Sequence, residues 1–193
     1  MAAGPLVHNV QMLRETLEGI PEPVLVRPYT FRYYRTGDEE NWYRIWSVAD
    51  AQHRGATPET FRKDFGTDEE LVAQRMFFVC DGKGWAVGTA TAWFRNYNRK
   101  EYGVVHWVAV LPEHQGKGIA KAVTARVLQR MKELGYVRAL LVTQPFRLAA
   151  IKVYLGLGFT PEIRNDDDVR EWRIVREKLS PGPLDAMDLD RLT

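Results

Sequence analysis

The stretch LPEHQGKGIAKAV, residues 111–123, joins a predicted strand to a predicted helix and decides the fold of the chain. Before it, GVVHWVAVL (residues 103–111) is apolar on both faces, which is typical of a central strand. After it, apolar residues recur at helical spacing, at Ile119, Val123, Val127, Met131 and Leu134. Gly116 and Gly118 stand where this helix begins, so backbone N–H groups of its first turn can approach an anion. The stretch therefore predicts a phosphate-binding loop between a strand and a helix.

Two familiar glycine-rich motifs fail here. The P-loop requires a Gly-Lys pair followed by Ser or Thr, whereas Gly118 is followed by Ile119. The dinucleotide motif G-x-G-x-x-G would need a small residue at Lys121, whose bulk blocks close packing of helix on strand. An ordinary turn that happens to contain glycines stays open as the alternative. In an anion site, Lys117 would add a positive charge.

Length and composition predict one globular domain. The chain has 193 residues, of which 45% are hydrophobic and 27% charged, with a net charge of +2. Such a small charge argues against a nucleic-acid partner. The single cysteine, Cys80, excludes an internal disulfide and a cysteine metal cluster. Because no apolar run is long enough to span a bilayer and no signal peptide is evident, we expect a cytoplasmic protein that is not bound to a membrane.

Strand and helix patterns alternate along the chain, which predicts an α/β fold. Strands are expected at residues 29–35, 75–81, 85–94, 103–111, 137–143, 158–163 and 169–179. Helices are expected at residues 36–52, 57–75 with a break near Gly66, 119–134 with Gly135 as its C-cap, and 147–155. We therefore expect a mixed, mostly antiparallel sheet of about six or seven strands, flanked by about four helices. Prolines at 21 and 23 set residues 1–28 apart as an N-terminal arm, and residues 180–193 form a C-terminal tail.

The loop and its surroundings resemble the GNAT superfamily of acyl-CoA-dependent N-acetyltransferases. The family loop [Q/R]-x-x-G-x-[G/A] is matched by Gln115-Gly116-Lys117-Gly118-Ile119-Ala120. Downstream, RLAAIKVYLGLGF (residues 147–159) is similar to the family segment N-x-x-A-x-x-x-Y-x-x-x-G-F, except that Arg147 stands where the family often has a cofactor-contacting Asn. The resemblance covers residues 29–179 and implies a single GNAT-like domain whose sheet is splayed at the centre.

The resemblance implies acetyl-CoA (coenzyme A) as the acyl-donor cosubstrate, with no metal. In the family, backbone amides of the loop hold the CoA pyrophosphate, and the strand before it pairs with the pantetheine arm. Arg147 would contact a CoA phosphate or point to solvent, and both options stay open. The implied cofactor-binding residues are Val108, Ala109, Val110, Gln115, Gly116, Lys117, Gly118, Ile119, Ala120, Lys121, Arg147 and Tyr154.

Two residues are candidates for the chemistry of amide formation. A lysine-like amine has a pKa of about 10.4, so a nearby base lowers the cost of forming the neutral nucleophile. His106 is the candidate base, because strand alternation would place it on the same face as Val108 and Val110. It also matches a functional histidine of the arylalkylamine N-acetyltransferases, one GNAT branch. Tyr154 matches the family tyrosine whose hydroxyl lies beside the CoA sulfur.

Alternatives to these two roles stay open. His106 and Tyr154 would each also suit a core position, Glu101 is a second candidate base, and some family members use water chains without a dedicated base. The oxyanion would be held by the N–H of Val108, again by resemblance.

The acceptor is expected to be a small-molecule amine. Ten aromatic residues fall in segments that build the acceptor site in the family, and they would suit an aromatic or cationic amine, although their spacing also suits a core. They are Trp42, Tyr43, Trp46, Phe61, Phe65, Trp93, Phe94, Tyr97, Tyr102 and Trp107. Asn165–Asp168 is predicted to be a solvated turn between the last two strands.

The predicted function is acetyl transfer from acetyl-CoA to this amine by direct attack in a ternary complex. A homodimer is expected by resemblance, since GNAT domains often dimerise. The alternatives are a non-catalytic acyl-CoA-binding sensor or interaction module, and a nucleotide-binding domain that uses the same loop.

Overall fold

The computed structural model describes residues 8–49 and 57–189. By its internal contacts the chain forms two compact units. The larger unit is residues 17–139, and the smaller unit combines residues 1–16 with residues 140–193. Residues 50–52 of the first predicted helix and the outermost residues of the predicted arm and tail lie outside the described ranges. In the described ranges, no helix has the length and apolar character needed to cross a membrane.

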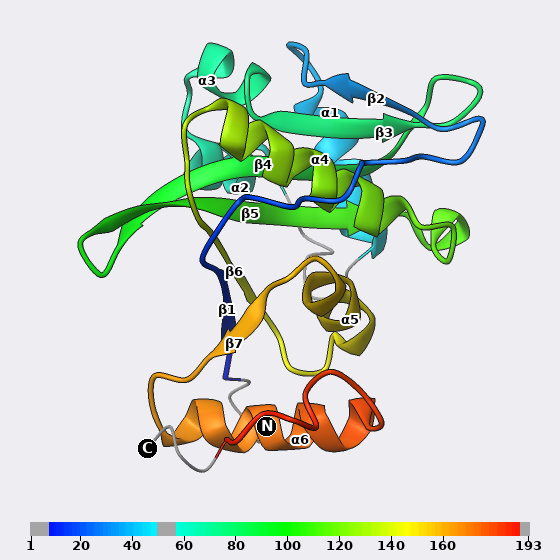
Figure 1. The fold of residues 1–193 in the computed structure, drawn as a ribbon. Helices are drawn as coiled ribbons and strands as arrows, with labels where there is room; N and C mark the ends of the chain where they lie inside the picture. The colour runs from blue at the N-terminus through cyan, green and yellow to red at the C-terminus, as the bar shows by residue number, and fades with distance from the viewer. Residues whose placement is uncertain (1–7, 50–56, 190–193) are drawn as a thin grey trace, which may run out of the picture. The chain divides into compact units, whose positions relative to one another are not determined.

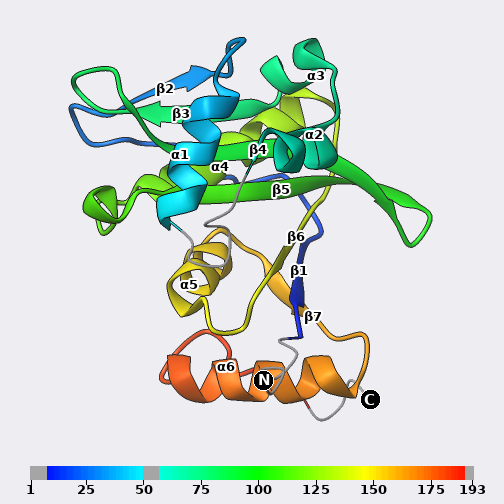
Figure 2. The same cartoon turned by 180° about the vertical axis from the view of Figure 1, so that it is seen from behind.

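The larger unit is built on an antiparallel sheet in the order β2-β3-β4-β5. Its strands are β2 (Thr30–Tyr33), β3 (Met76–Cys80), β4 (Ala86–Tyr97) and β5 (Lys100–Val110). Helix α4 (Ile119–Glu133) covers one face of this sheet, as seen at the front of Figure 1. Helices α1 (Glu39–Ala49) and α2 (Pro58–Phe65) cover the other face, which Figure 2 turns toward the reader. The short helix α3 (Glu69–Ala73) leads into β3.

Local signals explain where these helices begin and end. Thr57 and Thr60 form a capping box at the start of α2, and Gly66 ends it with a φ of 76°. The predicted break near Gly66 is therefore confirmed. At the end of α4, Gly135 adopts a φ of 88°, and the N–H of Tyr136 donates to the carbonyl of Met131 at 3.0 Å. This pattern is a glycine-terminated helix of the Schellman type, with Gly135 one residue beyond the cap.

A β-bulge interrupts β5 next to the predicted base. Thr91 of β4 pairs with His106, whereas Thr89 pairs with Ala109, so Trp107 and Val108 together oppose the single residue Ala90. Trp107 adopts a φ of 51°, in the left-handed region.

The bulge shifts strand alternation by one residue. His106 therefore shares a face of the sheet with Ala109, opposite to the face of Val110. The prediction that His106, Val108 and Val110 share a face is wrong for this reason.

The smaller unit contains β6 (Ala139–Thr143), β1 (Val10–Arg14) and β7 (Thr160–Glu162), with β1 between the other two. β1 pairs antiparallel with β7, with Met12 opposite Pro161. Val10 and Met12 are completely buried. The segment predicted as an N-terminal arm (residues 1–28) thus contributes an inner strand. Helix α5 (Leu148–Gly156) confirms the predicted helix at residues 147–155.

The last predicted strand is wrong, because residues 169–179 belong to the helix α6 (Asp166–Leu179). The side chain of Asn165 caps this helix by accepting the N–H of Asp168 at 3.0 Å. Three aspartates occupy its first turn, where negative charge is favourable, and Val169, Trp172, Val175 and Leu179 are buried along one side. Asn165–Asp168, predicted to be a solvated turn, is therefore a helix cap and first turn.

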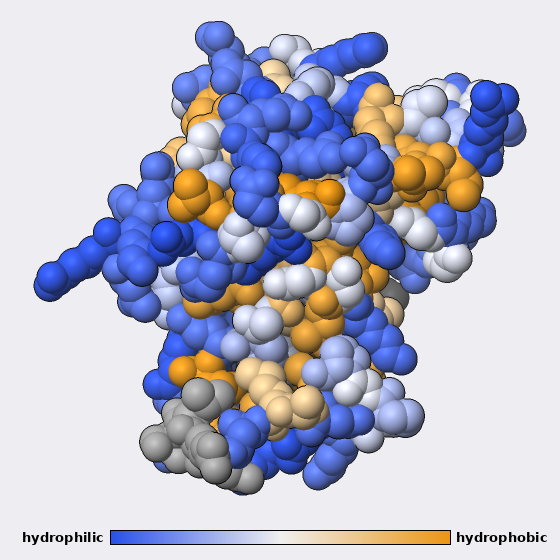
Figure 3. Space-filling view, viewed as in Figure 1, coloured by the Kyte–Doolittle hydropathy of each residue, from blue (hydrophilic) through white to orange (hydrophobic). Residues whose placement is uncertain are grey.

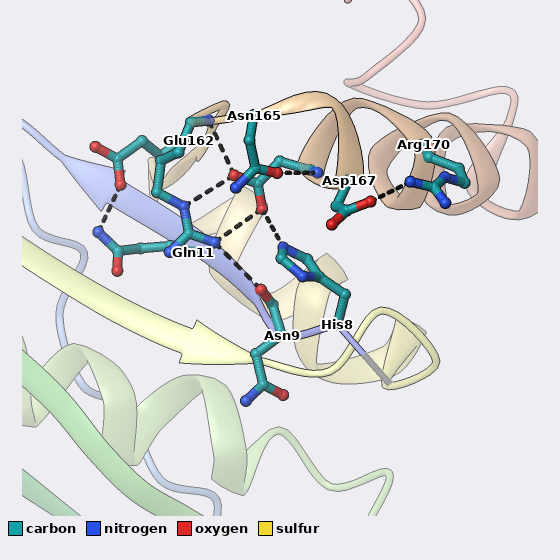
Figure 4. A network of polar contacts seen from close by, with 9 residues as sticks. His8, Asn9, Gln11, Glu162, Asn165, Asp167 and Arg170 are labelled. Carbon is teal, nitrogen blue, oxygen red and sulfur yellow. Dashed lines mark hydrogen bonds and ion pairs between the residues drawn. The ribbon is translucent and has the colours of Figure 1, made fainter. Parts of the chain in front are cut away.

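Polar contacts join α6 to the segment around β1 (Figure 4). The Asp168 side chain is fully buried. It accepts hydrogen bonds from Arg164 Nη2 at 2.8 Å and Arg164 Nε at 2.9 Å, and lies 2.8 Å from His8 Nε2. Burial alone would raise the pKa of Asp168, but the hydrogen bonds from Arg164 and His8 hold that pKa below its ordinary value. The carboxylate is thus charged and fully partnered.

The predicted α/β class and the number of strands are confirmed. The described residues contain seven strands and six α-helices, two more helices than expected, since α3 and α6 were not predicted as separate helices. On the face that Figure 3 shows, polar residues cover most of the surface and apolar residues appear in small groups.

Candidate functional site

The loop between β5 and α4 has the backbone that the glycine pattern predicts. Gly116 adopts a φ of 74° and Gly118 a φ of 77°, both in the left-handed region. Gly118 is the N-cap of α4, and apart from the adjoining residues nothing lies within 4 Å of the position that a Cβ would take at either glycine. The glycines are therefore required by backbone conformation and leave the loop open to a ligand.

The first turn of α4 presents N–H groups without helical acceptors. The bonds of the helix begin where Ala122 N–H donates to the carbonyl of Gly118 at 3.0 Å, so the N–H groups of the residues before Ala122 point out of the helix end. No acidic residue stands in this first turn. Because the N-terminus of a helix carries a partial positive charge, the loop suits a phosphate group.

Side chains around the loop fix its shape. Gln115 Nε2 donates to the carbonyl of Val110 at 2.9 Å, which joins the loop to the end of β5. Lys117 Nζ donates to the carbonyl of Glu113 at 2.9 Å and to the hydroxyl of Tyr29 at 3.2 Å. That hydroxyl lies 2.9 Å from His114 Nδ1. Lys117 is thus held at the loop, and Tyr29 is a contact that the sequence pattern does not signal.

His106 lies among aromatic rings. Its ring centroid is 5.6 Å from that of Phe65 and 5.9 Å from that of Trp107. His106 is partly exposed to solvent. Its imidazole is nevertheless largely surrounded by protein atoms. Burial, with a smaller effect from the charge of Arg95, lowers the pKa of His106 to about 4. At neutral pH the imidazole is therefore uncharged and has a nitrogen lone pair available.

The predicted acceptor aromatics divide into two groups. Trp42, Trp46, Phe61 and Phe65 are buried, and Trp107 stacks edge-on against Trp42 at 4.9 Å and Trp46 at 4.5 Å. These residues form the core between α1, α2 and the sheet. Tyr43, Trp93, Phe94 and Tyr97 keep partial exposure. Tyr102 is buried as well and packs edge-on against Tyr97, with ring centroids 5.8 Å apart. Glu101, the second candidate base, is exposed near the start of β5.

A cleft of about 310 Å³ opens between α1, α2 and the start of α3. Its lining includes four carboxylates, Glu39, Glu40, Asp68 and Glu69, and three aromatic side chains, Tyr34, Tyr43 and Phe61. Phe61 packs on Phe65 at 4.8 Å, and Phe65 in turn packs on His106. A continuous series of aromatic rings therefore connects the wall of this acidic cleft with the candidate base.

Tyr154 and Arg147 belong to the smaller unit. Tyr154 is 8% exposed and packs against Phe159 with ring centroids 6.2 Å apart. Burial raises the pKa of Tyr154 to about 12, and the nearby positive charge of Arg147 acts in the opposite direction. Arg147 is the N-cap of α5, and its guanidinium lies 5.8 Å from the centroid of Phe146. The phenol is therefore protonated at neutral pH, with a cation nearby.

The larger unit thus brings together the bulged end of β5, His106 and the loop of Gln115–Ala120, and the smaller unit brings together Tyr154 and Arg147. Within the described ranges, no group of three or more His, Cys, Asp or Glu side chains is arranged to hold a metal ion.

Comparison with known proteins agrees with this geometry. The family model "Acetyltransferase (GNAT) family" matches residues 33–159, about two thirds of the chain. The chain belongs to the GNAT family. The matched range includes both the GNAT loop at Gln115–Ala120 and Tyr154.

The relatives include mycothiol acetyltransferases of Streptomyces species. That of Streptomyces bingchenggensis is 32% identical over 143 residues, which is 73% of this chain and 46% of the relative. That of Streptomyces griseus is 30% identical over 160 residues, which is 80% of this chain and 51% of the relative. The chain spans about half the length of the curated relatives it matches.

Solved structures confirm the GNAT fold. A GCN5-related N-acetyltransferase from Sphaerobacter thermophilus matches with a TM-score of 0.65 at 21% identity, over 81% of this chain and 49% of that one. The NatC complex bound to Gag peptide and CoA matches with a TM-score of 0.58 at 19% identity, over 70% of this chain and 87% of that one.

Proposed function

We propose that this protein transfers an acetyl group from acetyl-CoA to the amine of a small-molecule acceptor, by direct attack of the amine on the thioester. The observation that carries the proposal is the loop Gln115–Ala120, in which two left-handed glycines open the N-terminus of α4 directly after a bulged strand. Family membership supports the same cosubstrate.

The residues present fit coenzyme A as the ligand of the loop. Unbonded N–H groups, the absence of acidic side chains in the first turn and the ammonium of Lys117 all favour a pyrophosphate. The proposed cofactor-binding set is the one predicted from the sequence: Val108–Val110 and Gln115–Lys121 in the larger unit, and Arg147 and Tyr154 in the smaller unit. When bound, acetyl-CoA supplies the activated acyl group.

His106 is proposed to accept the proton that the acceptor nitrogen loses. An imidazole with a pKa of about 4 is too weak a base to deprotonate a free ammonium ion. The neutral amine attacks the carbonyl, and its nitrogen then carries a positive charge and is bonded to a carbon that bears oxygen and sulfur. These electron-withdrawing atoms make the nitrogen more acidic than a free ammonium ion. His106 therefore acts as or after the C–N bond forms, and its neutrality at pH 7 keeps a lone pair available for this step.

Tyr154 is proposed to stabilise the departing sulfur. As the C–S bond breaks, the sulfur gains a negative charge and then a proton, since a free thiol has a pKa of about 8.5. A phenol with a pKa of about 12 is a good hydrogen-bond donor at pH 7. Complete proton transfer from the phenol to the thiolate would cost about 5 kcal/mol. Tyr154 therefore stabilises the thiolate by a hydrogen bond and keeps its own proton. The proton that the amine loses is the one that finally converts the thiolate to the thiol of CoA.

The acceptor class that the chain suits is a small cationic amine. Four carboxylates, one guanidinium (Arg62) and three aromatic rings line the cleft beside α1. The excess of negative charge and the aromatic faces favour an ammonium group there. The relatives named mycothiol acetyltransferases support a small-molecule acceptor.

The test combines a binding panel with an activity panel. A thermal-shift series with CoA, ATP and NAD is expected to show stabilisation by CoA that ATP and NAD do not match. Incubation with acetyl-CoA and a panel of cationic, neutral and anionic amines, followed by detection of free thiol, is expected to show turnover on cationic amines. Tight CoA binding without turnover on any amine would favour the non-catalytic sensor instead. Stabilisation by ATP or NAD that CoA does not displace would favour a nucleotide-binding domain.

A further inference from the structure

Two buried hydroxyl groups stand on the face of β4 that carries His106. Thr89 and Thr91 are both 0% exposed. In the part of the chain that the structure describes, neither Oγ1 atom has a hydrogen-bond partner. A buried hydroxyl without a partner lowers stability, and valine has the same shape and suits a buried strand at least as well. Packing alone therefore does not account for threonine at these two positions.

The two threonines differ in what lies opposite them. Thr91 pairs directly with His106 across the β4–β5 ladder, whereas Thr89 pairs with Ala109. Side chains of directly opposed residues lie on the same face, with Cβ atoms about 4.5–5.5 Å apart. At this Cβ spacing, an imidazole nitrogen and a threonine Oγ1 are close enough to form a hydrogen bond when both side chains turn toward each other.

The ring nitrogens of His106 also lack hydrogen-bond partners among the described residues. Its neighbours Phe65 and Trp107 contact it only through ring faces and edges, and no hydrogen bond to its ring nitrogens is present among the described residues. A neutral imidazole carries one N–H donor and one acceptor nitrogen, and a fixed partner for the N–H decides which nitrogen is free. Hydrogen bonds of catalytic groups are often incomplete in the unliganded protein and tighten when substrate binds.

We propose that Thr91 is a positioning residue for His106: its hydroxyl oxygen accepts the imidazole N–H and leaves the other ring nitrogen to take the proton of the acceptor amine. The inference rests on the proposed function, in which His106 is the base. In the step itself, the N–H bond of the acceptor breaks, a new N–H bond forms on the free ring nitrogen, and the electron pair stays in the new amide. Thr91 exchanges no proton with the substrate and holds the ring in one tautomer.

The chain offers a matched control for this proposal. Thr91→Val and Thr89→Val each remove one buried, unpartnered hydroxyl from the same strand face, but only the first removes it from opposite His106. With acetyl-CoA and with phenethylamine, tyramine and spermidine as probe amines, Thr91→Val is expected to lower kcat about tenfold or more, the value of one lost hydrogen bond. KM values should change by less than about threefold, and the thermal midpoint should stay equal or rise. Thr89→Val should keep kcat within about twofold, which is within ordinary variation for a neutral change.

Two further variants make the outcome decisive. Thr91→Ser keeps the hydroxyl and is expected to restore most of the lost kcat. In a His106→Gln background, Thr91→Val should have no further effect, because the residue acts only through His106. Equal kcat values for Thr91→Val and Thr89→Val, or no rescue by serine, would overturn the positioning role while leaving the proposed function intact. Wild-type turnover by His106→Gln would overturn the role of His106 as the base, and the positioning role of Thr91 with it. Absence of turnover by the wild type on every amine of the wider panel would instead overturn the proposed function.

Discussion

At the scale of single residues, one physical cause accounts for the protonation states of the two groups proposed to act in catalysis. Burial disfavours charge, so it lowers the pKa of His106 to about 4 and raises that of Tyr154 to about 12. Both side chains are therefore uncharged at neutral pH, one as a proton acceptor and the other as a hydrogen-bond donor. In acetyl transfer from a thioester to an amine, these are the states that the nitrogen and the sulfur need.

The shifted pKa of His106 predicts how stability depends on pH. The unfolded chain, with a histidine pKa of about 6.5, binds this proton at a higher pH than the folded chain, with a pKa of about 4. Stability from the neutral imidazole is therefore present above pH 6.5 and is lost as the pH falls toward 4. We expect the unfolding free energy of the wild type, measured with urea at pH 7 and pH 4.5, to fall by about 2–3 kcal/mol more than that of His106→Asn. Equal losses in the two proteins would mean that the imidazole is solvated in the folded state.

Tyr154→Phe separates catalysis from binding. The substitution keeps the ring that packs on Phe159 and removes only the hydroxyl, so the fold should persist. We expect kcat to fall about 100-fold, as for loss of a group that assists proton movement. The dissociation constant of CoA, measured by calorimetry, should change by less than about threefold, equivalent to under 1 kcal/mol. An unchanged kcat would leave Tyr154 as a core residue of α5.

At the scale of elements, the two ends of α4 provide a controlled test of the loop. Gly118 and Gly135 have φ values of 77° and 88°, and at both positions the space for a Cβ is open. Alanine at either position should therefore cost a similar 1–2 kcal/mol, roughly the penalty of a left-handed residue. Only Gly118→Ala is expected to weaken CoA binding, by about tenfold or more, because a methyl group would stand where the phosphate must approach. Equal CoA affinities of Gly118→Ala and Gly135→Ala, measured by calorimetry, would show that the loop does not bind the cofactor.

The elements also show what the sequence can and cannot predict. The loop, α4 and the β3–β4 hairpin were predictable, because glycine positions and periodic apolar residues act locally. The bulge was not, because Trp107 at a φ of 51° carries no glycine signal and is held there by packing on Trp42 and Trp46. Helix α6 was missed although Asn165, the three aspartates after it and the spacing of Val169 and Trp172 were visible signals. A closing strand is expected at this place in the chain, although the residues at 165–168 form a helix N-cap and an acidic first turn.

At the scale of the whole molecule, the chain builds one of its compact units from its two ends. Residues 1–16 and residues 140–193 belong to the same unit, and β1 lies between β6 and β7. Position 12 contacts position 161 across this ladder, so the pairing closes a long loop of chain. Local patterns carry no information about such a partner, and a strand that precedes two prolines then resembles a detached arm.

This arrangement predicts unequal costs for two substitutions within the segment first predicted to be an arm. Met12 is 0% exposed in β1, whereas Val24 is 74% exposed. Met12→Ala should destabilise the protein by about 2–5 kcal/mol, because it leaves a cavity in the core against β1. Val24→Ala should stay within about 0.5 kcal/mol of the wild type, as is usual for exposed positions. If urea unfolding gave both variants the stability of the wild type, residues 10–14 would be an arm outside the folded core, and the sheet of the smaller unit would hold without its middle strand.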